Sequence, residues 1–146
     1  RNHNNRKVHF FLNIADKGKN RPCGLRIKGA GRLIAEQNIR IVWEKKEITH
    51  RDFIGSPGYV KRVMMNILSN AVKYNRENGH IYITCTEIPS EQPGMTTMEF
   101  VCRDTGIGMT EAFQKQIFEP FAQEHTGSRT KFAGTGLGMP ISKKLI

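Results

Sequence analysis

The sequence contains only three cysteines, Cys23, Cys85 and Cys102, and they form neither a Cys-x-x-Cys pair nor a Cys/His spacing typical of metal sites. The small, odd number argues against a disulfide framework and favours a reducing, cytoplasmic setting. Because Cys85 and Cys102 fall in predicted strands, we expect both to be buried structural thiols.

Long hydrophobic runs are also absent. No stretch approaches the roughly 20 apolar residues that cross a bilayer, and the N-terminus lacks the apolar region of a signal peptide. We therefore expect no direct membrane contact by this chain. The possibility that a longer parent protein is anchored in a membrane stays open. Because the chain begins at Arg1 and not at methionine, we expect a fragment of a longer protein.

Acidic residues are scarce: 13 stand against 23 basic residues, which gives a net charge of +10. Such a balance favours an anionic partner, namely nucleic acid, a membrane surface or a polyphosphate ligand. The basic residues are scattered, however, and the sequence has no zinc-finger, basic-zipper or RNA-recognition signature. We therefore expect no nucleic-acid partner. The length of 146 residues with 38% apolar residues suits one core.

Hydrophobic periodicity predicts both strands and helices. Alternating apolar residues predict strands at 7–14, 39–44, 81–88 and 97–102. Helical spacing and capping residues predict helices at 24–37, from Ser56-Pro57 to about Tyr74, from Thr110 to about Gln116, and from Gly138 onward. The last two strands are expected to form an antiparallel hairpin with a long turn. This mixture predicts an α+β two-layer sandwich.

Four polar residues share one face of the clearest helix. Asn66, Asn70, Lys73 and Tyr74 fall at positions i, i+4, i+7 and i+8. Taken alone, this stripe is typical of a solvated face. The alternative is a face that binds a ligand, because carboxamide oxygens suit Mg²⁺ and a lysine suits phosphate.

Two glycine-rich loops follow, "DTGIGM" at 104–109 and "GTGLGM" at 134–139. In the first, the carboxylate of Asp104 can accept a hydrogen bond from an exocyclic amine, and glycines let a flat ring approach the backbone. In the second, backbone N–H groups at a helix start can bind phosphate. Neither loop matches the dinucleotide or Walker pattern, and each alone is typical of a turn or linker. Together with the polar helix they favour a nucleotide site.

Four segments carry a resemblance to a known family. "MNILSNAVKYN" (65–75), "DTGIGM", "IFEPF" (117–121) and "GTGLGM" resemble, in order, the N, G1, F and G2 boxes of the catalytic, ATP-binding domain of sensor histidine kinases. That family belongs to the superfamily of gyrase, Hsp90-type chaperones and MutL. The resemblance covers residues 24–146 and implies a Bergerat-type sandwich with a mixed, mainly antiparallel sheet. It implies an ATP lid at 122–134, and leaves residues 1–23 as an N-terminal strand and loop.

The resemblance implies ATP and Mg²⁺ as ligands. Asn70 would hold the Mg²⁺ with Asn66 nearby, Lys73 would contact phosphate, and Tyr74 would pack near the nucleotide. Asn66, Asn70 and Lys73 are thus the candidate catalytic residues.

The two loops and the F box have implied roles as well. Asp104 would accept from the adenine amino group, while Gly106, Gly108 and Met109 would line the base pocket. Phosphate would be bound by the backbone of Gly134, Gly136 and Gly138, supported by Thr135 and Leu137. Phe118 and Phe121 would anchor the lid and contact the domain that carries the acceptor histidine.

Position 66 separates kinases from hydrolases in this superfamily. In the gyrase and chaperone branch, a glutamate that activates water stands four residues before the Mg²⁺ asparagine. Asn66 occupies that position here, and a neutral amide is a poor general base. The resemblance therefore implies a protein-histidine kinase that transfers the γ-phosphate of ATP. A conformational ATPase and a non-catalytic nucleotide-sensing module stay open as alternatives.

The implied partners are a separate histidine phosphoacceptor/dimerisation domain and a cognate response regulator. None of the five histidines lies in a sequence like the family's phosphoacceptor box; they are His3, His9, His50, His80 and His125. The family also continues beyond the second glycine loop through a full helix and two strands, whereas this chain ends at Ile146. We therefore expect a truncated sheet. The strand at 7–14 could occupy part of the position of the missing strands. Pro140 in the first helical turn is compatible with a helix.

Overall fold

The computed structural model describes residues 6–15, 37–50, 53–124 and 134–146. They form a four-stranded sheet in the order β1-β4-β3-β2. Its strands are β1 (Arg6–Ala15), β2 (Arg40–Glu47), β3 (His80–Pro89) and β4 (Met95–Asp104). β4 is antiparallel to both of its neighbours, and β2 is parallel to β3. The sheet is therefore mixed and mainly antiparallel, as predicted.

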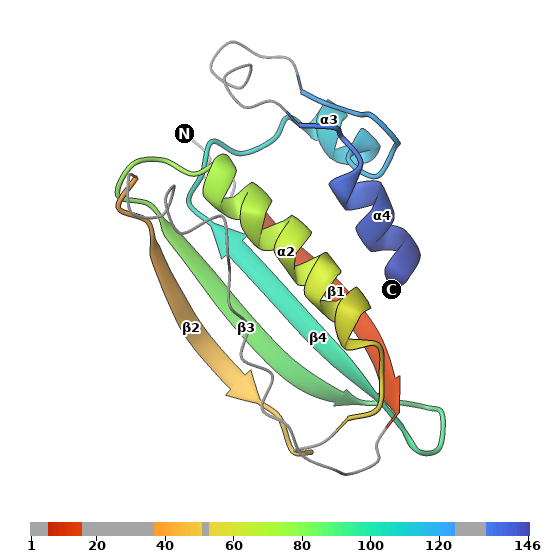
Figure 1. Cartoon of the computed structure of the whole chain (residues 1–146). Helices are drawn as coiled ribbons and strands as arrows, with labels where there is room; N and C mark the ends of the chain where they lie inside the picture. Colours follow the sequence, from red (N-terminus) through yellow and green to blue (C-terminus); the bar gives the residue numbers. More distant parts are fainter. Residues whose placement is uncertain (1–5, 16–36, 51–52, 125–133) are drawn as a thin grey trace.

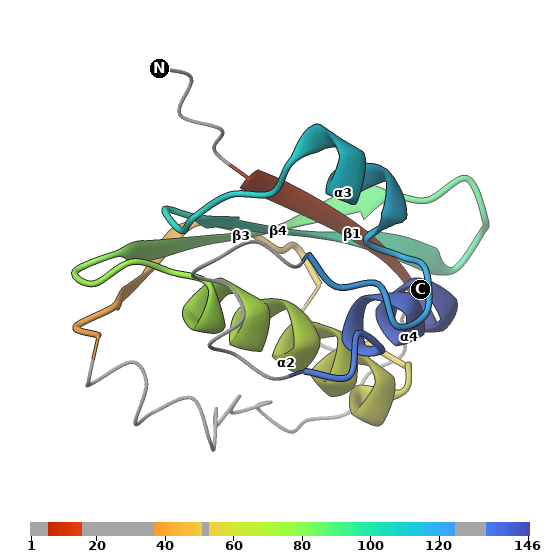
Figure 2. The same cartoon turned by 90° about the horizontal axis from the view of Figure 1, so that it is seen from above.

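The described helices are α2 (Pro57–Lys73), α3 (Glu111–Gln116) and α4 (Gly138–Leu145). α2 and α4 cover one face of the sheet, and α3 lies beyond the end of the sheet at which β4 ends (Figures 1 and 2). The predicted two-layer α+β sandwich is confirmed. In the described part of the chain, no helix is both long and apolar enough to cross a membrane.

The ends of α2 follow from its sequence. Ser56 caps the helix, since its Oγ accepts from the Tyr59 N–H at 3.4 Å, and Pro57 fills the first position, where an N–H has no helical partner. Tyr74 ends the helix. The helix predicted at 24–37 lies outside the described residues except for Gln37, which is part of a turn.

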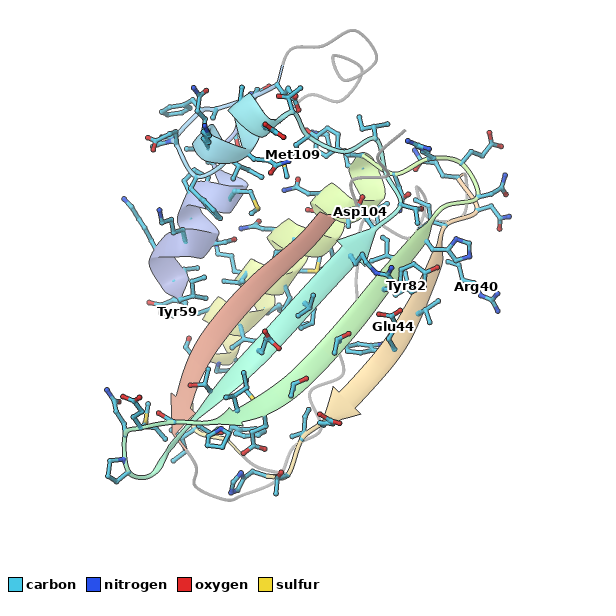
Figure 3. The ribbon with its side chains drawn as sticks, turned by 180° about the vertical axis from the view of Figure 1, so that it is seen from behind. Arg40, Glu44, Tyr59, Tyr82, Asp104 and Met109 are labelled. Carbon is cyan, nitrogen blue, oxygen red and sulfur yellow. The ribbon has the colours of Figure 1, made fainter. Side chains whose placement is uncertain are left out.

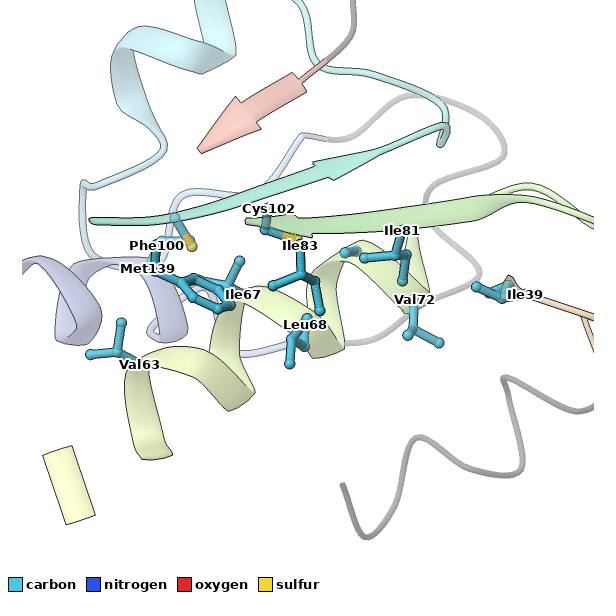
Figure 4. Packing of buried hydrophobic residues seen from close by; sticks show 11 residues of the cluster. Ile39, Val63, Ile67, Leu68, Val72, Ile81, Ile83, Phe100, Cys102 and Met139 are labelled. Carbon is cyan, nitrogen blue, oxygen red and sulfur yellow. The ribbon is translucent and has the colours of Figure 1, made fainter. Parts of the chain in front are cut away.

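The hydrophobic core lies between α2 and the sheet, with α4 closing one side (Figure 4). Its residues from α2 recur at helical spacing: Val63, Ile67, Leu68, Ala71 and Val72. They pack against Ile81 and Ile83 of β3 and against Phe100 and Cys102 of β4. Replacing a fully buried leucine such as Leu68 by alanine typically costs about 2–5 kcal/mol of folding free energy.

Strict alternation in β4 determines where Asp104 lies. Every second residue of the strand is buried, from Thr96 to Asp104. Because side chains alternate between the faces of a sheet, Asp104 continues the row of Phe100 and Cys102 on the helix-covered face. Asp104 therefore ends the strand beneath α2 and not on the open face.

β1 is the edge strand beside β4, with a register that runs from Arg6 opposite Asp104 to Ala15 opposite Met95. The predicted strand at 7–14 thus joins the same sheet as the rest of the chain. Whether it takes the place of strands found later in related domains stays a prediction.

The face of the sheet away from the helices carries a polar ladder across three strands. Arg103 donates to Glu44 Oε1 at 2.7 Å, and its guanidinium lies 4.3 Å from the centre of the Tyr82 ring. Tyr82 and Glu44 are side by side on this face in Figure 3. An exposed ion pair of this kind contributes little stability alone.

Candidate functional site

A cavity of about 310 Å³ opens between α2, the end of β4, α3 and the start of α4. The predicted site residues that line it are Asn66, Asn70, Lys73, Tyr74, Asp104, Met109, Gly134, Thr135, Gly136 and Gly138. Both glycine loops and the polar stripe of α2 thus meet around one cavity, although about 60 residues of sequence separate the polar stripe from the second glycine loop. The other predicted residues do not line it: Gly106, Gly108, Phe118, Phe121 and Leu137.

The polar stripe of α2 is half-buried and faces this cavity, which favours the interpretation as a face that binds a ligand. The Lys73 ammonium lies 4.9 Å from the centre of the Tyr74 ring. The same ammonium would be 2.9 Å from a Cβ built on Gly134. Lys73 therefore reaches from α2 to the second glycine loop, and its charge lies beside that loop's backbone.

The first glycine loop packs against the end of α2. Asp104 is only 8% exposed, and its Oδ1 accepts from the Gly106 N–H at 2.8 Å. The Ile107 N–H donates to the Tyr74 carbonyl at 3.0 Å. A Cβ on Gly106 would lie 2.3 Å from that carbonyl oxygen, so no side chain fits there. The loop then leads past Met109 to α3 (Figure 3).

A buried hydrogen-bond network behind this loop was not predicted from the sequence. Asn75, which is 8% exposed, accepts from the Arg76 N–H at 2.9 Å and from the Thr105 hydroxyl at 3.2 Å, and donates to the His80 carbonyl at 3.3 Å. The Thr105 hydroxyl also receives the His80 N–H at 2.9 Å. The residue after Asp104 is thus tied to both the end of α2 and the start of β3.

The second glycine loop needs a glycine at position 136, and it leads directly into α4. Gly136 has a φ of 68°, and a Cβ there would lie 2.7 Å from the Phe121 backbone. α4 follows with Leu137 at its N-cap position and no side-chain cap. Its first-turn N–H groups therefore have no capping side chain, which is the arrangement that binds anions. Pro140 lies in the first turn without disturbing the helix, as expected.

Asn66 joins α2 to the start of α4. Its Nδ2 donates to the Gly138 carbonyl at 2.9 Å and to Ser142 Oγ at 3.0 Å. A Cβ on Gly138 would lie 3.5 Å from the Asn66 carboxamide, so the two residues are closely packed. With both amide hydrogens directed at α4, Asn66 has no basic group to activate water.

The two F-box aromatics differ in burial. Phe118 packs against the core, and the Lys143 ammonium lies 5.2 Å from its ring centre. The Phe121 side chain is 71% exposed, while its backbone lies against Gly136. Phe118 therefore has a packing role in the described structure, and the Phe121 ring is available at the surface.

Several lining residues were missed in the sequence. They are Ile67, Ser69, Ala71, Cys102, Phe113, Ile117 and Met139. Phe113 lies in α3 and Ile117 directly follows it, and that helix is too short for its periodicity to identify a face. Cys85 and Cys102 were both expected to be buried; Cys102 is, whereas Cys85 is only half-buried. Burial raises the pKa of the Cys102 thiol to about 12, so it stays protonated.

Both ends of the predicted lid reach the cavity, whereas 125–133 lie outside the described residues. Gln123 Nε2 donates to the Gly134 carbonyl, which holds the two ends together. Glu124 Oε1 accepts from the Thr110 N–H at 3.0 Å, at the start of α3. The described residues include no cluster of three or more His, Cys, Asp or Glu side chains.

Comparison with known proteins gives consistent results. The sequence profile described as "Histidine kinase-, DNA gyrase B-, and HSP90-like ATPase" matches residues 55–146. Hybrid signal transduction histidine kinase F of Dictyostelium discoideum is 39% identical over 99 residues, which are 68% of this chain and 9% of that protein. The sensory/regulatory protein RpfC of Xanthomonas campestris pv. campestris is 33% identical over 63% of this chain and 12% of its own length.

Solved structures agree with these relatives. The catalytic domain of the histidine kinase ThkA, in a nucleotide-free form, superposes with a TM-score of 0.60 at 27% identity, covering 82% of this chain and 73% of that one. Full-length ShkA in complex with AMPPNP superposes with a TM-score of 0.59 at 26% identity, covering 82% of this chain and 23% of that one. The chain thus corresponds to one domain within much longer curated relatives.

Proposed function

Because the chain belongs to the family of histidine kinase-, DNA gyrase B- and HSP90-like ATPases, we propose that its cavity binds Mg²⁺-ATP and that it acts as the catalytic domain of a sensor histidine kinase. The observation that carries this proposal is the common cavity of Asp104, Asn70 and Gly136. These residues come from three separate segments and supply an acceptor, a hard oxygen ligand and backbone donors. A nucleoside triphosphate needs all three.

The base would bind at the Asp104 end of the cavity. A buried carboxylate that already accepts from the Gly106 N–H retains acceptor capacity for an exocyclic amine. Met109 and Tyr74 line the cavity next to it and provide apolar surface for a flat ring. Gly106 and Gly108 do not line the cavity, and we assign them the shape of the loop.

The triphosphate would extend to the opposite end. Lys73 and the backbone of Gly134, Gly136 and Gly138 would contact phosphate oxygens, with Thr135 and Leu137 shaping that loop. Asn70 would hold Mg²⁺, which commonly uses one or two protein oxygens together with phosphates and water. A bound Mg²⁺ would supply charge neutralisation to the phosphates.

Asn66 supports a kinase and not a hydrolase. Its amide is committed to α4, and an amide cannot serve as the general base that hydrolysis requires. The γ-phosphate would therefore await a histidine on a separate phosphoacceptor/dimerisation domain, and a response regulator would receive it next. The exposed Phe121 ring and the ends of the lid are the surfaces we assign to the phosphoacceptor domain.

Residues 1–23 and 24–146 would act together as this domain, because β1 pairs with β4. The lid would comprise residues 122–134.

The test is a titration of this chain with AMPPNP, with and without Mg²⁺, by calorimetry. We expect binding that Mg²⁺ strengthens, that Asn70→Ala makes insensitive to Mg²⁺, and that Lys73→Ala weakens. Lys61→Ala is the matched control, because Lys61 is exposed on the same helix and does not line the cavity. A folded chain that binds no nucleotide at millimolar concentration would refute the proposal.

Phosphotransfer is tested separately by adding ATP and a histidine-bearing helical hairpin from a related kinase. Labelled phosphate on the hairpin histidine supports the kinase. Steady-state hydrolysis without the hairpin, abolished by Asn66→Ala, would support a conformational ATPase instead.

A further inference from the structure

Ser142 is a buried polar residue to which the proposed function assigns no role. It is 0% exposed and lies in α4, one turn after Gly138. Its Oγ donates to the Gly138 carbonyl at 2.9 Å and accepts from Asn66 Nδ2 at 3.0 Å. Serine hydroxyls within helices often bond back to the carbonyl four residues earlier. The bond from Asn66 is the additional feature, because it comes from another helix.

The two acceptors on α4 determine how the Asn66 carboxamide is turned. An amide group has a donor side and an acceptor side, and its hydrogen bonds decide which faces which neighbour. Here the donor side faces the Gly138 carbonyl and the Ser142 hydroxyl, which leaves Oδ1 as the acceptor for other groups. Without the Ser142 hydroxyl, one amide hydrogen of the half-buried Asn66 would lose its partner.

The same bonds locate the start of α4. Gly138 is the first residue of the helix, and Gly134 and Gly136 precede it directly along the cavity wall. Leu137 at the N-cap position makes no side-chain capping bond that would fix this end in another way. The contact from Asn66 is thus a direct side-chain link between α2 and the backbone at the phosphate end of the cavity, which is the end lined by Gly134, Gly136 and Gly138.

We propose that Ser142 is a positioning residue for triphosphate binding: acting through Asn66, it holds the start of α4 and the second glycine loop against α2. This inference rests on the proposed function, since it concerns the same cavity. It predicts an effect at the phosphate end alone. The base end is held by separate contacts from Tyr74 and Asn75.

The test measures the affinity of Mg²⁺-AMPPNP and of adenosine for the wild-type chain and for Ser142→Ala by NMR titration. We expect Ser142→Ala to weaken AMPPNP about fivefold to tenfold, the order of one or two lost hydrogen bonds, and adenosine less than twofold. Ser90→Ala is the matched control, because Ser90 lies in the loop after β3 and its Oγ accepts a local hydrogen bond from the Gln92 N–H at 3.2 Å. It should leave both affinities unchanged.

A double-mutant cycle distinguishes positioning through Asn66 from a general structural effect. We expect Asn66→Ala and Asn66→Ala/Ser142→Ala to bind AMPPNP equally, because the other Ser142 bond, to the Gly138 carbonyl, stays within α4 and does not link it to α2. Additive losses, or equal losses for AMPPNP and adenosine, would overturn the inference. If Ser142→Ala does not fold, Ser142→Cys, which nearly keeps the volume but is a weak acceptor, replaces it with the same outcomes.

The controls also separate this inference from the proposed function. If the wild-type chain binds AMPPNP and Ser142→Ala binds it equally well, only the role of Ser142 is refuted. If the folded wild-type chain binds no AMPPNP, both are refuted.

Discussion

Replacing Asn75 by alanine tests whether the base end of the cavity is held by the network behind it. The substitution removes three hydrogen bonds, from the Arg76 N–H, from the Thr105 hydroxyl and to the His80 carbonyl. At about 1 kcal/mol net for each bond, the free energy of unfolding should fall by about 3 kcal/mol. Because Asn75 is 8% exposed, water compensates little of this loss.

The same substitution should lower the affinity of every ligand that binds through an adenine base. Thr105 stands between Asp104 and Gly106, so loss of its anchor loosens the loop that would receive the adenine. We expect adenosine and AMPPNP to lose affinity by the same factor, about tenfold. Ser142→Ala should instead affect AMPPNP alone.

The assay combines urea unfolding with the two ligand titrations. Thr105→Val removes the partner hydroxyl, and its effect on stability should add only in part to that of Asn75→Ala, because the two side chains share one hydrogen bond and each makes others. Thr86→Val is the control, because Thr86 is half-buried on the other face of the sheet. An Asn75→Ala chain within about 0.5 kcal/mol of wild type, or one with unchanged adenosine affinity, would refute the reasoning.

Three further predictions concern other parts of the chain. Asp104→Asn should reduce the preference for ATP over GTP at least tenfold in competition titrations. The reason is that the new side-chain amide is itself a donor and would face the donor of the adenine amino group. Unchanged preference would contradict the role of Asp104. Hydrogen bonds from the His50 N–H, the His50 ring, the Thr49 N–H and the Thr96 hydroxyl lower the pKa of Glu87 from 4.5 to about 2. Since the folded pKa lies below the unfolded one, this stabilisation is complete above pH 4.5 and is lost as the pH falls towards 2; acid unfolding of Glu87→Gln should therefore depend less on pH in that range. Gly136→Ala should abolish AMPPNP binding, because a φ of 68° and a Cβ at 2.7 Å from the Phe121 backbone force the loop to move, and retained binding would show that the loop tolerates it.

Local signals were sufficient where neighbouring residues decide the structure. Ser56 and Pro57 fixed the start of α2, and alternation located β3 and β4. The prediction for β2 stopped at residue 44 because alternation breaks there. The structure shows a β-bulge between Trp43 and Lys45, after which the strand continues to Glu47. A bulge shifts the side-chain phase by one residue, so a strict period cannot detect the continuation.

The shared cavity was predictable because its motifs occur together, and the network behind it was not. Asn75 and Ser142 resemble ordinary polar residues in the sequence, and their partners Thr105 and Asn66 lie 30 and 76 residues away. Such side-chain bonds between distant elements leave no periodic pattern. The pairing of β1 with β4, which joins residues at least 80 positions apart, is hidden for the same reason.

The two ends of the cavity are supported in different ways. At the base end, backbone bonds from Ile107 to Tyr74 and from Thr105 to His80 add to the buried Asn75 side chain. At the phosphate end, α4 has no capping side chain, and the Asn66 amide reaches it across the interface with α2. Regions held by fewer buried contacts open at lower free energy. The end of the cavity at Asp104 is therefore the preorganised part, and the second glycine loop is the part that a bound triphosphate would stabilise through its own contacts.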